Sequence, residues 1–168
     1  MTTLYLSRHG ETEENLARIF QGCLPGRLTE RGREQAIEMG KSLLGVPIDC
    51  IVSSDLQRAT DTVDLINNTL HLPVFTTPLL RERDWGEITG LKIGSVNVDD
   101  YESVETVAAM TQRAAEALHF FRTEFAGKRV LVVSHGLFMR CLRGVAEGKS
   151  IQEVERWQNC QVVRLDLC

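Results

Sequence analysis

The chain has 168 residues, of which 43% are hydrophobic and 25% are charged, and its formal net charge at pH 7 is −4. This is the composition of an ordinary globular protein that is long enough to bury one core, so we expect a single domain over residues 1–168. The net negative charge excludes a general electrostatic attraction to nucleic acid or to an anionic membrane.

The cysteines and the hydropathy pattern indicate a cytoplasmic protein. The five cysteines are widely spaced and include no Cys-x-x-Cys pair, which argues against a disulfide framework or a zinc knuckle and suits a reducing compartment. No stretch approaches the length of about 18 apolar residues that a membrane span needs. No basic region followed by an apolar run begins the chain, so we expect no signal peptide.

The first predicted element is a short buried strand at residues 4–6, followed by Ser7-Arg8-His9-Gly10. The glycine breaks the strand and leaves Arg8 and His9 at its carboxyl end, where open α/β sheets bind their ligands. The guanidinium of Arg8 suits a phosphate or a carboxylate, and the imidazole of His9 can act as base, acid or nucleophile near neutral pH. The pair indicates an anion held beside a reactive imidazole.

The next segment, residues 11–26, is predicted to be a loop with a short helical stretch around residues 14–20. It contains Asn15, Gln21 and Gly22, which are hydrogen-bonding or turn-forming residues suited to lining a polar site. By itself, this pattern is also typical of a plain solvated loop.

A helix over 29–44 and a strand over 49–53 follow, and residues 54–57 form a capping-box pattern that predicts the start of the next helix. Arg58 lies in the first turn of that helix and off its buried stripe. In a parallel sheet its side chain would therefore lie at the carboxyl edge, near His9, where a helix N-terminus also favours an anion.

A third strand is predicted at 74–76, and the charged stretch 79–86 after it includes a tryptophan. A charge run is usually a solvated face, but a tryptophan among alternating charges suggests a partly buried group. Glu82 is therefore a candidate acid and Arg83 a candidate orienting cation. A loop punctuated by glycines continues to about residue 100.

A long helix is predicted over 103–125 and a fourth strand over 129–133, which Ser134-His135-Gly136 follows. If this strand lies beside the first one, His135 would share a crevice with His9. A helix through residue 145, a short helix over 150–157 and a strand over 160–167 complete the chain. This order of elements predicts an α/β fold, a three-layer α/β/α sandwich with a mainly parallel central sheet.

Several other phosphate chemistries are excluded by inspection. Residues 144–150 resemble a Walker loop, but three residues instead of four separate the glycines, and a helix precedes them. The chain contains no cysteine-phosphatase signature, no Gly-x-Ser-x-Gly elbow and no residue cluster with metal-ligand spacing. We therefore expect no metal and no cofactor, which leaves histidine, arginine and one glutamate as the candidates.

These residues resemble the signature of the histidine phosphatase superfamily, in its phosphoglycerate mutase-like branch. The Arg-His-Gly motif alone is weak, but the ordered set of matching segments is specific and runs along nearly the whole chain. Among small members, the chain resembles α-ribazole phosphatases and broad-specificity phosphatases. The matching segments are residues 7–12, 15, 21–22, 28–32, 53–59, 80–82, 102–103 and 134–136.

The resemblance implies that His9 is the nucleophile, which becomes a phosphohistidine, and that Glu82 protonates the leaving group. Arginines and a protonated second histidine can surround a transferring phosphoryl group without a metal, and their field keeps a nucleophilic imidazole neutral. By the same resemblance, Arg8, Arg58 and His135 hold the phosphoryl oxygens. The other expected substrate- or phosphate-binding residues are Asn15, Gln21, Gly22, Arg83 and Gly136.

The function expected from these residues is metal-independent hydrolysis of small-molecule phosphate esters. The loop over 85–101 is short for the family, and a thin cover favours hydrolysis over the retained bisphosphate intermediate of a mutase. A phosphoglycerate mutase, a protein phosphohistidine or phosphoprotein phosphatase, and a non-catalytic phosphate-binding module are the alternatives. A binding module would have no use for the acid Glu82. The residues indicate neither the particular ester nor the oligomeric state.

Overall fold

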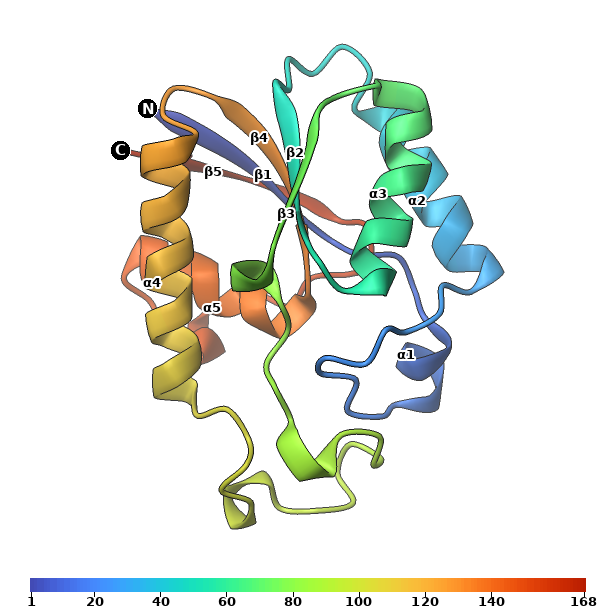
Figure 1. Ribbon diagram of the computed structural model, residues 1–168, viewed down its shortest axis with the longest axis vertical. Coiled ribbons are helices and arrows are strands. Elements are labelled where there is room, and N and C mark those ends of the chain that lie inside the picture. Colours follow the sequence, from blue (N-terminus) through green and yellow to red (C-terminus); the bar gives the residue numbers. More distant parts are fainter.

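The computed structural model describes all 168 residues and has a five-stranded sheet at its centre (Figure 1). The strands lie in the order β3-β2-β4-β1-β5. All neighbours run parallel except β5, which is antiparallel to β1. The predicted, mainly parallel sheet is therefore confirmed. The strands are β1 (Thr2–Arg8), β2 (Cys50–Ser54), β3 (Val74–Thr77), β4 (Arg129–Ser134) and β5 (Val162–Leu167).

Helices cover both faces of the sheet, with α2 and α3 on one side and α4 and α5 on the other (Figure 1). Strand β4 explains this arrangement, because its side chains alternate between the two faces. Val130 and Val132 pack in the core under α4 and α5, whereas Leu131 and Val133 pack in the core under α2 and α3. A strand buried on both faces is apolar throughout. The helices are α1 (Glu13–Ala17), α2 (Glu30–Ser42), α3 (Gln57–Leu70), α4 (Val107–Glu124) and α5 (Gly136–Glu147).

The register of the parallel strands aligns the ends that carry the predicted site. Arg8, the last residue of β1, pairs with Ser134, the last residue of β4. The register of β2 against β4 brings Ser54 to the same level. His9 and His135 directly follow β1 and β4, and the backbone N–H of His9 donates to the carbonyl oxygen of Ser134 at 3.0 Å. Two neighbouring strands therefore place both imidazoles at one edge of the sheet.

Two predicted helix starts are wrong. The long helix begins at Val107 and not at residue 103, because the side chain of Thr106 caps it. The expected capping box over 54–57 does not form, because the N-cap residue of α3 is Leu56, which has no side-chain cap. Instead, the hydroxyl oxygen of Ser54 accepts from the N–H of Leu56 at 3.3 Å. This hydroxyl is thus kept at the strand edge and not at a helix cap.

The predicted helix over 150–157 is also wrong, since the chain forms only one short turn there, η4 (Ile151–Glu153), before it extends toward β5. The loop before α4 contains two further short turns, η2 (Gly86–Ile88) and η3 (Val98–Asp100), and η1 (Pro78–Leu80) follows β3. No helix is both long and apolar enough to cross a membrane.

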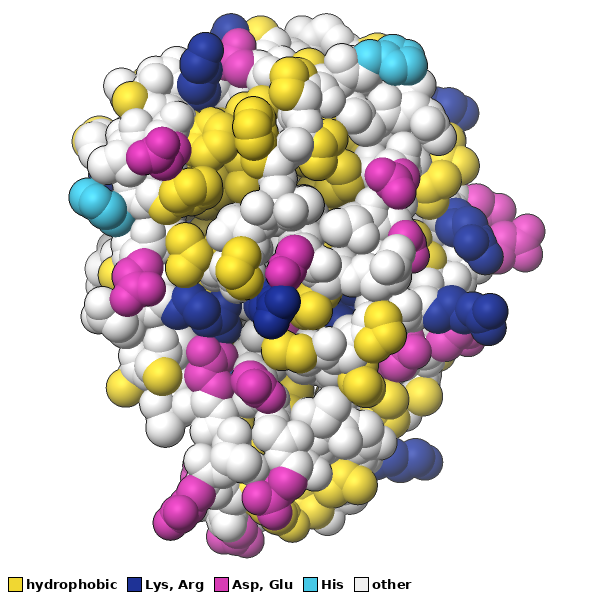
Figure 2. Space-filling view, in the orientation of Figure 1, with side chains coloured by type: hydrophobic (Ala, Val, Ile, Leu, Met, Phe, Trp, Pro, Cys, Tyr) yellow, Lys and Arg dark blue, Asp and Glu magenta, His cyan; other side chains and the backbone are white.

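The surface reflects the acidic composition of the chain. On the face drawn in Figure 2, acidic side chains gather at the lower end, where Figure 1 places the loop before α4, and apolar side chains gather in the upper half. Basic side chains also occur on this face, two of them next to each other near its centre.

The loop after β1 meets the first turn of α2 with backbone against backbone. A Cβ atom on Gly32 would overlap the carbonyl oxygen of Glu11, two residues beyond His9. Because the neighbour is backbone, it cannot move aside cheaply.

We expect Gly32→Ala to lower the free energy of unfolding by about 1–3 kcal/mol, the usual cost of overpacking. Replacing a glycine by alanine inside a helix normally stabilises it by about 1 kcal/mol, so the clash must cost more than this for the variant to be less stable than the wild type. Urea unfolding followed by circular dichroism measures the change, and Glu34→Ala at an exposed position of the same helix is the control. A Gly32→Ala protein as stable as the control would contradict the close contact.

Candidate active site

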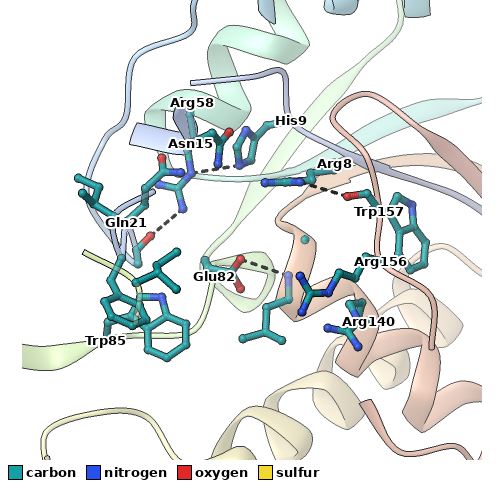
Figure 3. A pocket seen from close by; sticks show the side chains of 16 residues that line it. Arg8, His9, Asn15, Gln21, Arg58, Glu82, Trp85, Arg140, Arg156 and Trp157 are labelled. Atoms are coloured by element: carbon teal, nitrogen blue, oxygen red, sulfur yellow. Dashed lines mark hydrogen bonds between the residues drawn. The ribbon is translucent and has the colours of Figure 1, made fainter. Parts of the chain in front are cut away.

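A cavity of about 400 Å³ lies at the carboxyl edge of the sheet, and its wall combines residues from the first loop, α3, the segment after η1, and α5 (Figure 3). Most of the residues expected at the site line it. His135 is buried directly behind His9, with 5.2 Å between the centroids of the two rings. The expected residues on the wall are Arg8, His9, Asn15, Gln21, Gly22, Arg58, Glu82 and Gly136.

The imidazole of His9 is held in one tautomer. Its Nδ1 atom lies 2.7 Å from the carbonyl oxygen of Gly10. A carbonyl oxygen can only accept, so Nδ1 carries the proton and donates. In the neutral ring, Nε2 carries no proton, and its lone pair accepts from the Nε–H of Arg58 at 3.3 Å. The ring therefore presents an unprotonated, nucleophilic nitrogen beside the cavity.

Burial and charge both keep this ring neutral. Burial lowers the pKa of His9 well below 6.5, and the guanidiniums of Arg58 and Arg8 lower it further. Burial also lowers the pKa of Arg58 to about 10, so its guanidinium is still charged at pH 7. The site thus pairs permanent cations with an uncharged imidazole.

His135 is fixed by Ser54. The hydroxyl of Ser54 lies 2.8 Å from Nε2 of His135 and has no other acceptor for its proton, so the hydroxyl donates and Nε2 accepts. Burial, and then the charge of Arg58, hold the pKa of His135 well below 6.5, so the expectation of a protonated second histidine is wrong for this site. The proton of the neutral ring lies on Nδ1, which is buried and has no hydrogen-bond partner. A buried donor without a partner costs about 1–3 kcal/mol. An acceptor from a bound ligand would remove this cost.

The two arginines at the site are anchored by backbone carbonyls. Arg58, in the first turn of α3, is 1% exposed, and its Nη atoms donate to the carbonyl oxygens of Gly22, at 2.8 Å, and Leu24. Arg8 donates from Nη1 to the carbonyl oxygen of Trp157 at 3.1 Å, but its buried Nε has no partner. Arg8 and His135 thus each leave an unmatched N–H close to His9.

Glu82 lies across the cavity from His9 (Figure 3). Its carboxylate accepts from the N–H groups of Leu137, at 3.3 Å, and Phe138, at 3.0 Å, in the first turn of α5. It also accepts from the N–H of Arg83 at 2.9 Å. These three backbone N–H groups fix the position of the carboxyl group opposite His9.

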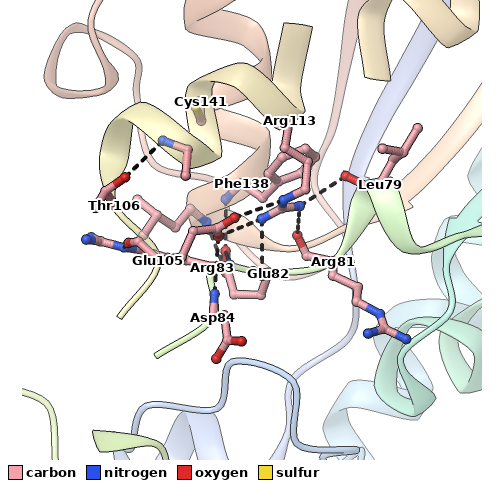
Figure 4. A network of polar contacts seen from close by, with 12 residues as sticks. Leu79, Arg81, Glu82, Arg83, Asp84, Glu105, Thr106, Arg113, Phe138 and Cys141 are labelled. Carbon is pink, nitrogen blue, oxygen red and sulfur yellow. Dashed lines mark hydrogen bonds and ion pairs between the residues drawn. The ribbon is translucent and has the colours of Figure 1, made fainter. Parts of the chain in front are cut away.

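Arg113 of α4 supports the segment that carries Glu82 (Figure 4). Its guanidinium donates to the carboxylate of Glu105 at 2.8 and 3.1 Å and to the carbonyl oxygens of residues 79, 81 and 82 at 2.7 to 3.4 Å. Its carbon Cζ also lies 4.2 Å from the ring centroid of Phe138. Arg113 therefore acts on the cavity only through the position of Glu82.

The structure does not bring Arg83 to the cavity wall. Its Nε donates to the carbonyl oxygen of Glu105 at 2.7 Å, and its guanidinium stacks on Trp85, 4.8 Å from the ring centroid. Trp85 itself does line the cavity. The charged stretch thus contributes its glutamate and its tryptophan, while the arginine packs behind them.

Sequence reasoning missed Ser54 as a site residue, and it missed Arg140, Arg156 and Trp157 on the cavity wall. Ser54 ends β2 at the level where Ser134 ends β4, so the repeated serine at the strand ends was a usable signal. No local motif marks the other three residues. They reach the cavity because α5 and the segment before β5 fold back over the end of β1.

Comparisons with known proteins give one consistent result. A profile of the histidine phosphatase superfamily (branch 1) matches residues 4–168. An uncharacterized phosphatase, PhoE, of Bacillus subtilis is 34% identical over 146 positions, which cover 84% of this chain and 76% of that protein. A probable phosphoglycerate mutase, GpmB, of Erwinia tasmaniensis is 31% identical, with 99% of this chain and 85% of that protein covered. The solved structure of a putative α-ribazole-5′-phosphate phosphatase from Escherichia coli superimposes with a TM-score of 0.86 at 27% identity, covering 97% of this chain and 89% of that one.

We expect His9 and His135 to be uncharged at pH 7, because burial and the nearby guanidiniums hold the pKa of each below 6.5. Nitrogen-15 NMR of the ring nitrogens between about pH 5 and 8 measures this, with the exposed His71 and His119 as reference resonances.

The lowered pKa values of His9 and His135 also predict that the stability of the protein depends on pH. The unfolded chain takes up these protons near pH 6.5 and the folded chain does not, so the free energy of unfolding should fall as the pH drops below about 6.5. A pKa above 7 for His9 would contradict the electrostatics described here.

Proposed function

Since the chain belongs to the histidine phosphatase superfamily (branch 1), we propose that it is a metal-independent phosphomonoesterase that hydrolyses small-molecule phosphate esters through a phosphohistidine on His9. Membership confirms the resemblance seen in the sequence, and relatives named as phosphatases agree with that enzyme class. We also propose that residues 1–168 form a single domain around the one sheet. The observation that carries the mechanism is the neutral Nε2 of His9 with unmatched N–H donors of Arg8 and His135 beside it.

In the first step, Nε2 of His9 attacks phosphorus in line with the ester oxygen. The N–P bond forms as the P–O bond breaks, and the carboxylic acid of Glu82 gives its proton to the departing oxygen. Arg8, Arg58 and the Nδ1–H of His135 donate to the non-bridging oxygens, where negative charge concentrates. The carbonyl oxygen of Gly10 stabilises the positive charge that the phosphorylated ring acquires.

In the second step, the carboxylate of Glu82 takes a proton from water as the water oxygen attacks phosphorus. The N–P bond breaks, inorganic phosphate leaves, and the ring of His9 returns to its neutral form with the proton on Nδ1. Glu82 ends protonated, as it began, so the cycle closes without a further reactant.

A mutase would use the same first step, but it must keep the intermediate until a second hydroxyl accepts the phosphoryl group. Within residues 83–106 only Trp85 and Ile93 line the cavity, and the segment forms no helix longer than the short turns η2 and η3. We infer that water reaches the phosphohistidine readily, which favours hydrolysis.

His9→Ala should reduce the hydrolysis of p-nitrophenyl phosphate to the uncatalysed background, because the nucleophile is lost. The assay is phosphate release in the presence of a chelator. The matched control is His119→Ala, at an exposed position of α4. Acid-labile, base-stable radiolabel from ³²P substrate should appear on the wild type and not on the variant. Full turnover by His9→Ala would rule out the mechanism.

Hydrolysis and mutase activity are separated with 3-phosphoglycerate, with and without a bisphosphate primer. We expect phosphate release to be faster than interconversion to 2-phosphoglycerate. The reverse order would assign the chain to mutase chemistry.

Glu82→Gln should lower kcat/KM by about 10²–10⁴ for an alkyl phosphate and by much less for p-nitrophenyl phosphate, because a good leaving group needs no proton. The parameter kcat/KM reports only the steps through ester cleavage, so it isolates the acid role. Arg113→Gln should lower kcat/KM in the same unequal manner, to a smaller extent, because it positions Glu82. An equal loss for both substrates would leave Arg113 with a structural role alone.

A further inference from the structure

The cavity is larger than the transferred group. A water molecule takes about 30 Å³ of liquid volume, so a phosphoryl group takes on the order of 100 Å³. The cavity measures about 400 Å³, and the residues proposed to hold the phosphoryl group lie at its inner end. The remaining volume, beyond Glu82 and Leu137, is available for the leaving group.

Two arginines without a counter-ion line this outer part. Arg140 projects from α5, and Arg156 precedes Trp157 (Figure 3). Neither side chain takes part in any ion pair of the structure, although acidic residues exceed basic ones in the chain. By contrast, the neighbouring Arg143 is paired with Glu147 at 2.6 Å and does not line the cavity.

Arg140 is held in place and is not a freely solvated side chain. It is half-buried, and it donates from Nε to the carbonyl oxygen of Val154 at 3.0 Å and from Nη2 to that of Ile151 at 2.8 Å. Burial lowers the pKa of Arg140, and the charge of Arg156 lowers it further. An anchored, half-buried Arg140 and an exposed Arg156 thus bring two like charges to one wall, and an anion between them would be stabilised by both.

The opposite wall of the cavity is apolar. Ile19, Phe20, Trp85 and Ile93 line it, and the rings of Phe20 and Trp85 are 4.7 Å apart. A leaving group in this space would therefore place its carbon skeleton against the aromatic wall and its charge toward the arginines.

We propose that Arg140 and Arg156 form a subsite for a second anionic group, a carboxylate or a phosphate, on the leaving group of the substrate. This inference rests on the proposed function, and it narrows the substrates to esters with a negative charge at both ends. The arginines take no part in the bond-breaking step. They act on the binding of the ester and on its orientation toward His9.

Three matched substrates test the subsite: propyl phosphate, 3-phosphonooxypropanoate and 1,3-propanediol bisphosphate. They share a three-carbon chain and differ in a neutral, a carboxylate or a phosphate end. We expect the wild type to prefer the anionic esters in kcat/KM. The ratio of anionic to neutral ester should fall about 10–100-fold in Arg156→Gln, as expected for the loss of a charge-assisted hydrogen bond.

Arg156→Glu should invert the preference, and Arg140→Gln should lower it. Arg33→Gln, at an exposed position of α2 that does not line the cavity, should leave the ratio unchanged. Arg156 is exposed and makes no hydrogen bond through its side chain, so its variants test the subsite without a risk to folding. The two anionic substrates also show whether the subsite favours a carboxylate or a phosphate. A wild type with no preference, or an Arg156→Gln ratio equal to that of the wild type, would overturn the proposal.

Calorimetry separates this inference from the proposed function. The His9→Ala protein should bind 3-phosphonooxypropanoate more tightly than propyl phosphate, and this difference should vanish when Arg156→Gln is added. If no ester is hydrolysed by the wild type but the binding preference is found, the proposed function fails and the subsite stands. If the esters are hydrolysed and the two bind His9→Ala equally, the subsite fails and the function stands.

Discussion

The alignment of three parallel strand ends is the constraint on which the site depends. β1 and β4 pair so that His9 and His135 follow neighbouring strands at the same level, and β2 brings Ser54 to that level from the other side of β4. A shift of one residue would turn each side chain to the opposite face of the sheet. Close packing in the two cores opposes this shift, because it would exchange the side chains of β4 between cores that are built from different neighbours. Packing far from the cavity thus sets its geometry.

The electrostatics of the site follow from what this alignment buries. Arg58 and His9 are almost wholly removed from solvent, and no carboxylate pairs with either one. A buried guanidinium is costly unless its N–H groups have partners, and the carbonyl oxygens of the first loop supply them for Arg58. The imidazoles of His9 and His135 remain neutral, which avoids the cost of burying a further charge. The inner cavity therefore holds net positive charge and unmatched N–H donors, conditions that a dianionic phosphoryl group would satisfy.

Support for the site comes in two layers. Arg8, Arg58 and Glu82 face the cavity. Backbone groups of other segments hold these three side chains in place through hydrogen bonds. Arg113 binds the carbonyls beside Glu82, and the first turn of α5 binds its carboxylate. Because the outer groups attach to backbone, the positions of the inner side chains depend on loops that lie far apart along the chain.

The sequence by itself determined the α/β class, the mainly parallel sheet and the two strand-His motifs, because hydrophobic periodicity and glycine breaks are local signals. It also indicated Arg58, whose place in a first helical turn follows from the position of the preceding strand. Only the tertiary structure decided that Arg83 packs against Trp85 and away from the cavity, that Ser54 orients His135, and that Arg140 and Arg156 line the outer wall. Each of these contacts joins side chains from segments that are far apart in the sequence, and the spacing of residues along the chain does not predict such contacts.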